Sequence, residues 1–300
     1  MKTLIDDWKT QLYNGKAIRL AFTEFTDQRV LTVIKRLMNE KIVIPVLIGD
    51  EQVLSTYVEE HDLTAVETIG VKGNLHTFSV EQLKKGKIDA LISGAVFTTK
   101  DVMQPALDQL KRRTAESRIS GAFILSKSDE RYLFADCSMH IEPSAKELAS
   151  IAIESVETAK KLHIEPKIAF LSYTTKAVRK DDSYVRIHQA IEKVKKALPE
   201  VPVDGELQFD SAFSKTIAKQ KTSPTSDVGD ATIFIFPNLE SGNIACKLIQ
   251  LMSTYDTLGP VVQGFQESFQ DLSRGATVES IYQVAIYAAY QALDHVSTTS

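Results

Sequence analysis

The sequence contains few cysteines and no cysteine motif. Its 300 residues include only two, Cys137 and Cys246, which lie far apart in apolar contexts. They form neither a CxxC pair nor a Cys/His pattern of the kind that binds zinc. We therefore expect two buried, reduced thiols and no metal site.

Long apolar runs are also missing. No run approaches the roughly twenty apolar residues that span a bilayer, and the N-terminal segment MKTLIDDWKT lacks the apolar core of a signal peptide. We therefore expect a cytoplasmic protein that has no membrane partner.

The chain carries no strong charge of either sign. Its formal net charge is −4 at pH 7, which gives no reason to expect a nucleic-acid partner. Any anion must therefore be bound by local basic residues. The length of 300 residues predicts one large or two medium domains.

Short apolar segments alternate with segments of helical spacing along most of the chain. Such alternation predicts an α/β protein in which helices cover both faces of parallel sheets, with ligands at the carboxyl ends of strands. A polar turn, KSDER, instead predicts an antiparallel hairpin between residues 118–125 and 132–135. The other predicted strands are 17–22, 42–48, 66–69, 88–92, 168–172, 201–207, 231–236 and 259–263. Helices are predicted at 3–13, 51–59, 80–85, 102–110, 184–198, 211–219 and 278–293, and two more are predicted to begin at Asp27 and Ser144. A surface loop is predicted at 221–229.

The stretch 231–280 contains the pattern strand, Gly turn, helix twice over. Its second loop, DLSRG, precedes a helix for which Thr277 is the expected N-cap. Ser273, Arg274 and Gly275 therefore lie where main-chain amides, the helix dipole and a guanidinium converge, which suits an anion. By itself, this pattern is more typical of an ordinary capped loop.

Several blocks of the sequence, in their order and spacing, resemble bacterial phosphate acetyltransferases, also called phosphotransacetylases. The C-terminal blocks are FIFPNLESGNIACKLIQ, GPVVQGF and DLSRG. Further blocks upstream are ISGAVFTTKDVMQPAL, YLFADCS, IAFLSYTTK and VDGELQFDSA. The resemblance extends from about Lys16 to Ala292, and several independent blocks in one order argue against chance.

The resemblance implies two three-layer α/β/α domains with mostly parallel sheets and a cleft between them, as in isocitrate and isopropylmalate dehydrogenases. The C-terminal segment of the family returns to the first domain. The expected domains are therefore residues 1–114 with 265–300, and residues 115–264. The resemblance also implies a homodimer.

The family reaction moves an acetyl group between coenzyme A and inorganic phosphate, giving acetyl phosphate in acetate metabolism. Such chemistry needs a phosphate site, donors for a tetrahedral oxyanion and a group that manages the thiol proton. Acetyl-CoA and phosphate are therefore the expected small-molecule partners. Coenzyme A is then a substrate, and no metal or other cofactor is expected.

Ser273 and Arg274 match the catalytic serine and arginine of the family, which by resemblance contact the thiol and the phosphate. A hydroxyl can donate to a developing thiolate, and a guanidinium binds phosphate oxygens in pairs. For Thr98 and Thr99, capping of the helix that follows is as good an interpretation as phosphate binding. The resemblance implies that the substrate-binding residues are Thr98, Thr99, Gln104, Asn243, Gln263, Gly264 and Ser280.

The sequence departs from the family pattern in four places. Ser280 stands where the family usually has an aspartate, seven residues after the serine and proposed as the base toward the thiol. Gln104 stands in place of an arginine, and Phe97 in place of a histidine. The short connection 71–87 lacks a helical segment that carries another arginine in the family.

These departures leave a second hypothesis open. A catalytically weakened paralogue could keep the cleft and act as a protein that binds coenzyme A or phosphate, or as a regulatory protein. A metal- and nicotinamide-dependent dehydrogenase of related architecture is a weaker third hypothesis, because the sequence offers no convincing set of clustered carboxylates.

Overall fold

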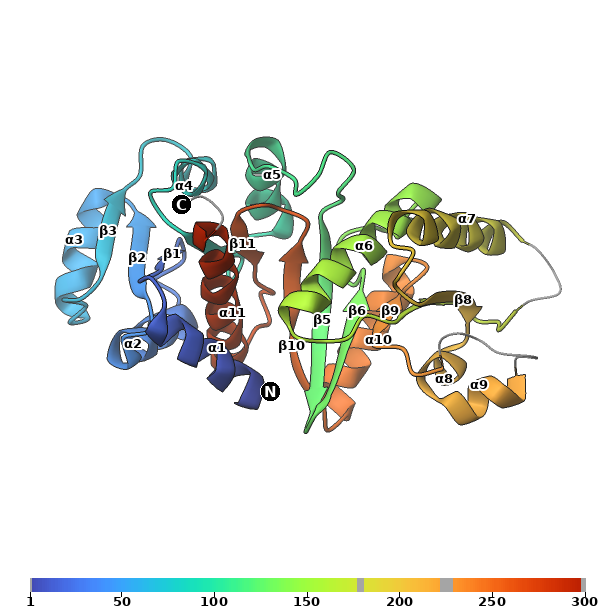
Figure 1. Ribbon diagram of the computed structural model, residues 1–300. Helices are drawn as coiled ribbons and strands as arrows, with labels where there is room; N and C mark the ends of the chain where they lie inside the picture. Colours follow the sequence, from blue (N-terminus) through green and yellow to red (C-terminus); the bar gives the residue numbers. More distant parts are fainter. Residues whose placement is uncertain (1, 177–180, 222–228, 298–300) are drawn as a thin grey trace. The chain divides into compact units, whose positions relative to one another are not determined.

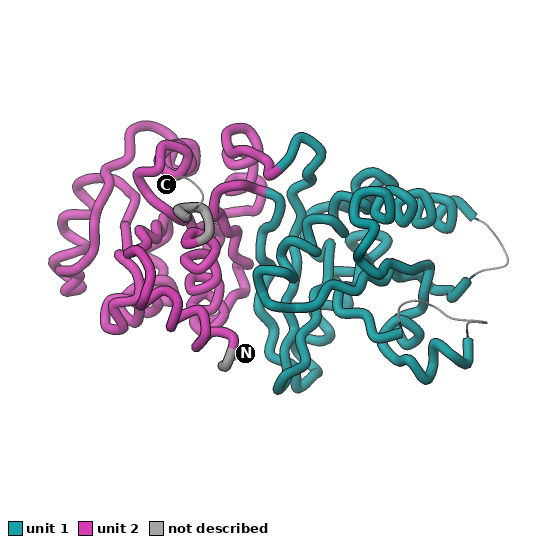
Figure 2. Tube along the Cα trace, in the orientation of Figure 1, with its two compact units in different colours: residues 1, 114–264 teal, residues 2–113, 265–300 magenta. Residues whose placement is uncertain are grey.

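The computed structural model describes residues 2–176, 181–221 and 229–297. The chain divides into two compact units: Thr114–Gly264 in unit 1, and Lys2–Arg113 with Phe265–Ser300 in unit 2 (Figure 2). Compactness does not show that a unit folds independently, so the predicted domains stay a prediction. The predicted surface loop at 221–229 lies almost entirely outside the described residues.

Unit 2 is built on a five-stranded parallel sheet with the strand order β11-β4-β1-β2-β3 (Figure 1). The chain moves outward from β1 to β2 and β3, then returns to the other side of β1 to form β4. The order of the strands therefore reverses between β1 and β4. The strands are β1 (Arg19–Phe22), β2 (Ile44–Gly49), β3 (Glu67–Gly70), β4 (Ala90–Ser93) and β11 (Ser268–Asp271).

Helices cover both faces of this sheet. Each right-handed connection between parallel strands places its helix on one face, and the face changes where the strand order reverses. The long α11 packs on α1 and α2 and contacts β11, β4 and β1, whereas α4 and α5 pack on each other and contact β4 and β11. Unit 2 therefore has three layers. Its helices are α1 (Lys2–Asn14), α2 (Gln28–Glu40), α3 (Glu51–Glu60), α4 (Leu75–Lys84), α5 (Thr99–Gln109) and α11 (Val278–Ser297).

Local sequence explains where these helices begin. The carboxylate of Asp27 accepts a hydrogen bond of 2.8 Å from the amide of Arg29 and caps α2, which buries an apolar face. The hydroxyl of Thr277 accepts a hydrogen bond of 3.1 Å from the amide of Ser280 at the start of α11. The predicted N-cap of this last helix is therefore confirmed.

Unit 1 contains a mixed six-stranded sheet with the order β10-β5-β6-β9-β7-β8. The predicted hairpin is confirmed, because β5 and β6 pair antiparallel, and β10 adds antiparallel to the other edge of β5. The remaining neighbours are parallel. The strands are β5 (Ser120–Lys127), β6 (Glu130–Ala135), β7 (Ile168–Leu171), β8 (Val203–Leu207), β9 (Ile233–Ile235) and β10 (Asp256–Gln263).

The helices of unit 1 lie between and beside these strands. A capping box joins Ser144 and Glu147 at the start of α6, where the sequence predicts that a helix begins. The helices are α6 (Ala145–Lys161), α7 (Asp182–Ala197), α8 (Phe209–Phe213), α9 (Lys215–Lys221) and α10 (Leu239–Met252). Both units combine helices with mostly parallel strand pairs, so the predicted α/β class is confirmed.

The sequence reading was wrong at three elements. It missed β11, whose residues Ser-Phe-Gln-Asp show neither alternation nor an apolar run although all four are buried. It predicted one helix at 211–219, but the extended backbone of Ser214 divides that segment into α8 and α9. It began α4 too late, since Asn74 caps this helix through the amide of Thr77. Within the described residues, no helix is both long and apolar enough to cross a membrane.

The contact between α1 and α11 depends on one large side chain and can be tested by mutation. Trp8 is 1% exposed and stacks on Tyr290, with ring centroids 5.3 Å apart. We expect Trp8→Ala to lower the free energy of unfolding by about 3 to 5 kcal/mol in urea titrations, because it removes a buried aromatic ring. Val53→Ala is the control, since Val53 is 47% exposed on α3. A loss below about 1 kcal/mol for Trp8→Ala would contradict this packing.

Candidate active site

The carboxyl ends of three neighbouring strands of unit 2 form the candidate site. The strands β11, β4 and β1 are adjacent and parallel, so the segments that follow them emerge at the same edge of the sheet. This edge includes the point between β1 and β4 where the strand order reverses. Ligands of open parallel sheets bind at such reversal points.

The segment after β4 is held by a buried carboxylate from the segment after β1. Glu24 is 6% exposed, and its oxygens accept hydrogen bonds from the amides of Ala95, Val96 and Phe97 at 2.7, 2.8 and 2.9 Å. Charge-assisted bonds to main-chain amides are strong. They fix the backbone that leads into Thr98 and α5.

Arg29 connects the segment after β4 with the loop after β11. Its guanidinium donates to the carbonyl oxygens of Ala95 and Ala276, both at 2.9 Å, and of Arg274 at 2.8 Å. It also pairs with the carboxylate of Asp27, where this hydrogen bonding lowers the pKa of the carboxyl group. One side chain thus binds the backbone of both loops.

Ser273 and Arg274 lie on the loop between β11 and α11. Pairing with β4 continues past the strand, since the amide of Leu272 donates to the carbonyl of Ser93 at 2.7 Å. Ser273 is half-buried and Arg274 is exposed. Within the described part of the chain, the Arg274 guanidinium has no ion pair, so it is available to an anion beside the start of α11.

Asp271 ends β11 and is buried beneath this loop. The carboxyl group is 7% exposed, and its Oδ1 atom has no hydrogen-bond partner in the described structure. Burial, with a smaller contribution from the charge of Glu24, raises the pKa of Asp271 to about 7, whereas a hydrogen bond with the Thr99 side chain acts in the opposite direction. This carboxyl group therefore changes protonation near neutral pH.

The predicted residues of α5 are exposed at the same edge. Thr98 caps the helix, as one of the two interpretations expected, and its hydroxyl donates to the carboxylate of Asp101 at 2.6 Å. Thr99 is the first residue of the helix. Gln104 is also exposed, and its amide donates to the carboxylate of Asp108 at 2.9 Å.

A cavity of about 700 Å³ lies beside Gln104, between α4 and α5. Its lining includes Phe97, Lys100 and His76, which is 8% exposed and meets the ring of Phe97 edge-on at 4.6 Å. Among the residues that the structure describes, the Nε2 atom of His76 has no hydrogen-bond partner, and burial lowers the pKa of the ring. The cavity thus combines an aromatic wall, a neutral imidazole and an ammonium group.

Ser280, in the first turn of α11, is not placed to act as a base. Its hydroxyl lies 2.9 Å from that of Thr277, and its amide is bonded to the same oxygen. A serine needs an activating group before it can remove a proton at neutral pH. The contacts of Ser280 are those of a helix-capping residue.

Three predicted substrate-binding residues belong to unit 1. Gln263 is 2% exposed, and its amide is occupied by the hydroxyls of Thr158, Ser120 and Ser155 at 2.9 to 3.0 Å. Gly264 has a φ of +102° that favours glycine. Asn243 is exposed on α10, and its amide donates to the carbonyl of Cys137 at 3.2 Å. A substrate role for these residues stays a prediction.

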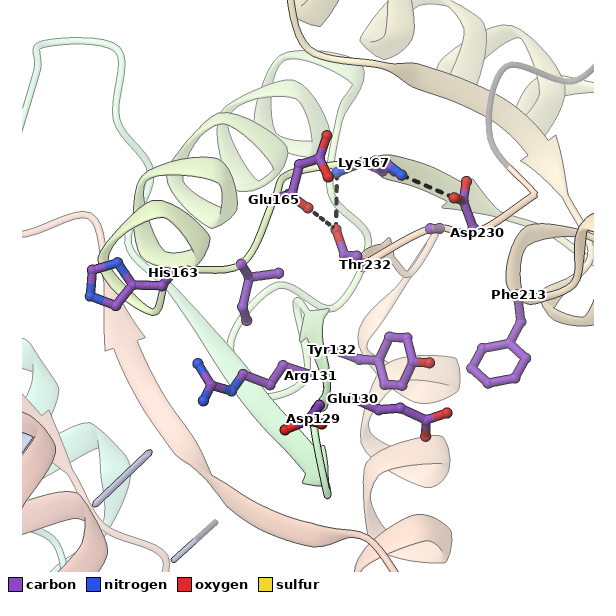
Figure 3. A pocket seen from close by; sticks show the side chains of 12 residues that line it. Asp129, Glu130, Arg131, Tyr132, His163, Glu165, Lys167, Phe213, Asp230 and Thr232 are labelled. Carbon is purple, nitrogen blue, oxygen red and sulfur yellow. Dashed lines mark hydrogen bonds and ion pairs between the residues drawn. The ribbon is translucent and has the colours of Figure 1, made fainter. Parts of the chain in front are cut away.

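A second cavity, of about 360 Å³, lies at the amino ends of β7 and β9 in unit 1 (Figure 3). Four of its lining residues, Glu165, Lys167, Asp230 and Thr232, are bonded to one another. Lys167 pairs with Asp230 at 2.9 Å, and its amide donates to the hydroxyl of Thr232 at 3.0 Å. We assign it no ligand, because parallel strands bind ligands at their carboxyl ends.

Sequence reasoning overlooked Glu24, Arg29 and Asp271. The signal available for Glu24 was its position directly after a predicted strand, where functional polar residues gather. Asp271 stands inside DLSRG, but the strand that it ends was not predicted. Among the described residues, no group of three or more His, Cys, Asp or Glu side chains could hold a metal ion.

The strand ends and loops of unit 2, together with the exposed guanidinium of Arg274, define the class of the protein. It is an α/β protein whose loops suit a phosphate-bearing ligand. Comparison with known proteins then gives the family. Residues 65–289 match the family described as "Phosphate acetyl/butaryl transferase".

Full-length relatives agree with this match. The chain is 35% identical to a phosphate acetyltransferase of Bacillus subtilis (strain 168), over 93% of this chain and 96% of that protein. It is 34% identical to a phosphate acetyltransferase of Staphylococcus aureus (strain Mu50), over 98% of this chain and 100% of that protein.

A solved structure is similar as well. A phosphotransacetylase from Streptococcus pyogenes superposes with a TM-score of 0.89 at 33% identity, covering 98% of this chain and 99% of that chain. The protein belongs to the phosphate acetyl/butaryl transferase family. The predicted family and the predicted class of enzyme, a transferase, are therefore confirmed.

The close approach of two strand ends makes Gly94 irreplaceable in this arrangement. Its φ is +99°, and an added Cβ atom would lie 2.2 Å from Oδ1 of Asp271. We expect Gly94→Ala to lower the free energy of unfolding by at least about 2 kcal/mol in urea titrations. Gly275→Ala is the matched control in the neighbouring loop, because its nearest atom would be 3.9 Å away. Equal stability of the two variants would contradict the described loop contacts.

Proposed function

We propose that the protein transfers an acetyl group between coenzyme A and inorganic phosphate, interconverting acetyl-CoA and acetyl phosphate. Membership of the family supports this activity. The observation that supports the site is the loop of Ser273 and Arg274, which Arg29 holds through two carbonyl oxygens at the start of α11. The exposed guanidinium of Arg274 then binds phosphate oxygens, and the hydroxyl of Ser273 donates to the thiolate sulfur.

We assign coenzyme A to the cavity between α4 and α5. Lys100 offers a positive charge to its phosphates, and Gln104 offers amide hydrogen bonds at the position where the resemblance implies an arginine. Phe97, which is 39% exposed, offers a face for apolar or aromatic parts of the ligand. The free state of the buried thiols Cys137 and Cys246 suits a cytoplasmic enzyme.

A protein that binds coenzyme A without efficient turnover is the second candidate function. The observation in its favour is Ser280, whose hydroxyl is bonded within the cap of α11 and offers no carboxylate. Calorimetric binding of coenzyme A by a protein that lacks turnover would support this alternative.

The role of Arg274 can be tested in the acetyl phosphate and coenzyme A assay. We expect Arg274→Ala to reduce turnover about a hundredfold or more and to raise the Michaelis constant for acetyl phosphate, because it removes charge stabilisation from the transition state and a charged contact to the phosphoryl group. Lys16→Ala is the control, since Lys16 precedes β1 and its side chain is 60% exposed. An Arg274→Ala enzyme with the rate of the control would remove the assigned role.

We also propose that the protein forms a homodimer through the exposed face of α10. Ile244, Leu248, Leu251 and Met252 are 52% to 82% exposed and follow helical spacing on that face. A self-complementary contact would bury this apolar surface in a second copy. We expect Leu248→Glu with Leu251→Glu to give monomers by light scattering, whereas Val53→Glu on α3 leaves dimers. A wild-type monomer, or a double variant that stays dimeric, would contradict the proposal.

A further inference from the structure

The cavity between α4 and α5 contains a buried imidazole to which no role has been given. His76, in the first turn of α4, lines this cavity and is 8% exposed. Among the residues that the structure describes, its Nε2 atom has no hydrogen-bond partner. A buried ring nitrogen without a partner is costly to retain, so it indicates a ligand that completes its hydrogen bonding.

Hydrogen bonds fix the walls around this ring. The side chain of Asn74 accepts a hydrogen bond of 3.0 Å from the amide of Thr77 and caps α4. The side-chain amide of Gln109 donates to the carbonyl of Thr77 at 3.2 Å, which joins the end of α5 to the start of α4. The ring of His76 meets that of Phe97 edge-on, with centroids 4.6 Å apart. The imidazole is thus held in place before a ligand binds, which lowers the cost of binding.

The charges on the cavity lining do not favour a group of several phosphates. The carboxylates of Asp101 and Asp108 line the cavity, whereas Lys100 supplies the one ammonium group among its described lining residues. The imidazole adds no positive charge near neutral pH, because burial lowers the pKa of His76. A phosphate inside the cavity would therefore meet more negative than positive charge. The uncharged half of coenzyme A, its pantetheine arm, is the better match.

The hydrogen-bonding groups of the cavity suit the amides of that arm. A neutral imidazole nitrogen donates in one tautomer and accepts in the other. An amide group can satisfy either tautomer, whereas an ionised phosphate oxygen only accepts. The side-chain amides of Gln104 and Gln109 line the same cavity, and Phe97 and Pro105 offer apolar surface. The pantetheine arm combines amides with a branched aliphatic segment, so both kinds of surface find a counterpart.

We propose that His76 binds the pantetheine arm of coenzyme A through a hydrogen bond between Nε2 and an amide of the arm. This role rests on the proposed function and deepens the assignment of coenzyme A to the cavity. The aliphatic segment of the arm packs on Phe97. The exposed ammonium group of Lys100 stays available to the phosphates.

Calorimetric titration with the two halves of coenzyme A tests this role without requiring turnover. The probes are pantetheine and adenosine 3′,5′-bisphosphate, with whole coenzyme A as the reference. His76→Phe keeps a ring beside Phe97 and removes the ring nitrogens. We expect it to weaken binding of pantetheine and of coenzyme A about tenfold, because one hydrogen bond is lost. Binding of the bisphosphate should not change.

His61→Phe is the matched control, because His61 ends α3 and does not line the cavity. This variant should bind every probe as the wild-type protein does. Equal binding of pantetheine by the two variants would overturn the role of His76. Weaker binding of the bisphosphate alone in His76→Phe would assign the cavity to the nucleotide half and overturn it as well. So would a wild-type protein that binds coenzyme A but not pantetheine.

Melting curves and kinetics separate a binding role from a structural one. His76→Phe removes a buried polar atom that lacks a partner, so we expect an unchanged or raised melting temperature. In the assay, the Michaelis constant for coenzyme A should rise about tenfold while kcat stays within a few fold. His76→Gln, which restores a hydrogen-bonding group, should recover part of the affinity. A lowered melting temperature with an unchanged Michaelis constant in His76→Phe would show a structural role and overturn the proposal.

The outcomes also separate the role of His76 from the proposed function. Binding of pantetheine that depends on His76, in a protein without turnover, would keep the binding site and overturn acyl transfer. Turnover that Arg274→Ala abolishes, with an unchanged Michaelis constant for coenzyme A in His76→Phe, would overturn the role of His76 and keep the acyltransferase.

Discussion

The buried carboxylate of Glu24 is the interaction on which the arrangement of the site depends. It accepts hydrogen bonds from three consecutive amides of the segment after β4. Fixing this segment places Ala95, whose carbonyl oxygen binds Arg29. Arg29 in turn holds the loop of Ser273 and Arg274. The fixed conformation of these loops thus depends on one carboxylate, whose charge is stabilised by main-chain amides.

The parallel sheet explains why these groups meet although they are far apart in the sequence. Glu24 and Ala95 are 71 residues apart, and Arg29 and Arg274 are 245 apart. Parallel pairing of β1, β4 and β11 brings their carboxyl ends to one edge. Because β11 belongs to the C-terminal part of the chain, unit 2 is completed only when that part returns to β4.

The separation in sequence between contacting residues explains what the sequence could predict. The caps at Ser144 and Thr277 involve neighbours within a few residues, so local patterns were sufficient to place the starts of these helices. The loop DLSRG was found because its residues, and its position before a helix, match the family pattern. The strand β11 was missed because its polar residues are buried by long-range pairing rather than by an apolar pattern. The same holds for the contacts of Glu24 and Arg29, which no local pattern contains.

The burial of Asp271 is a cost to stability that the fold retains. Its folded pKa of about 7 exceeds the value near 3.9 of an unfolded aspartate, so the folded state holds a proton that the unfolded state releases. Stability from this group is therefore fully present below about pH 4 and is lost as the pH rises through 7. An asparagine would avoid this loss and could still donate a hydrogen bond. A titrating carboxyl group is thus the less stable choice above pH 7, so stability alone does not account for an aspartate at this position.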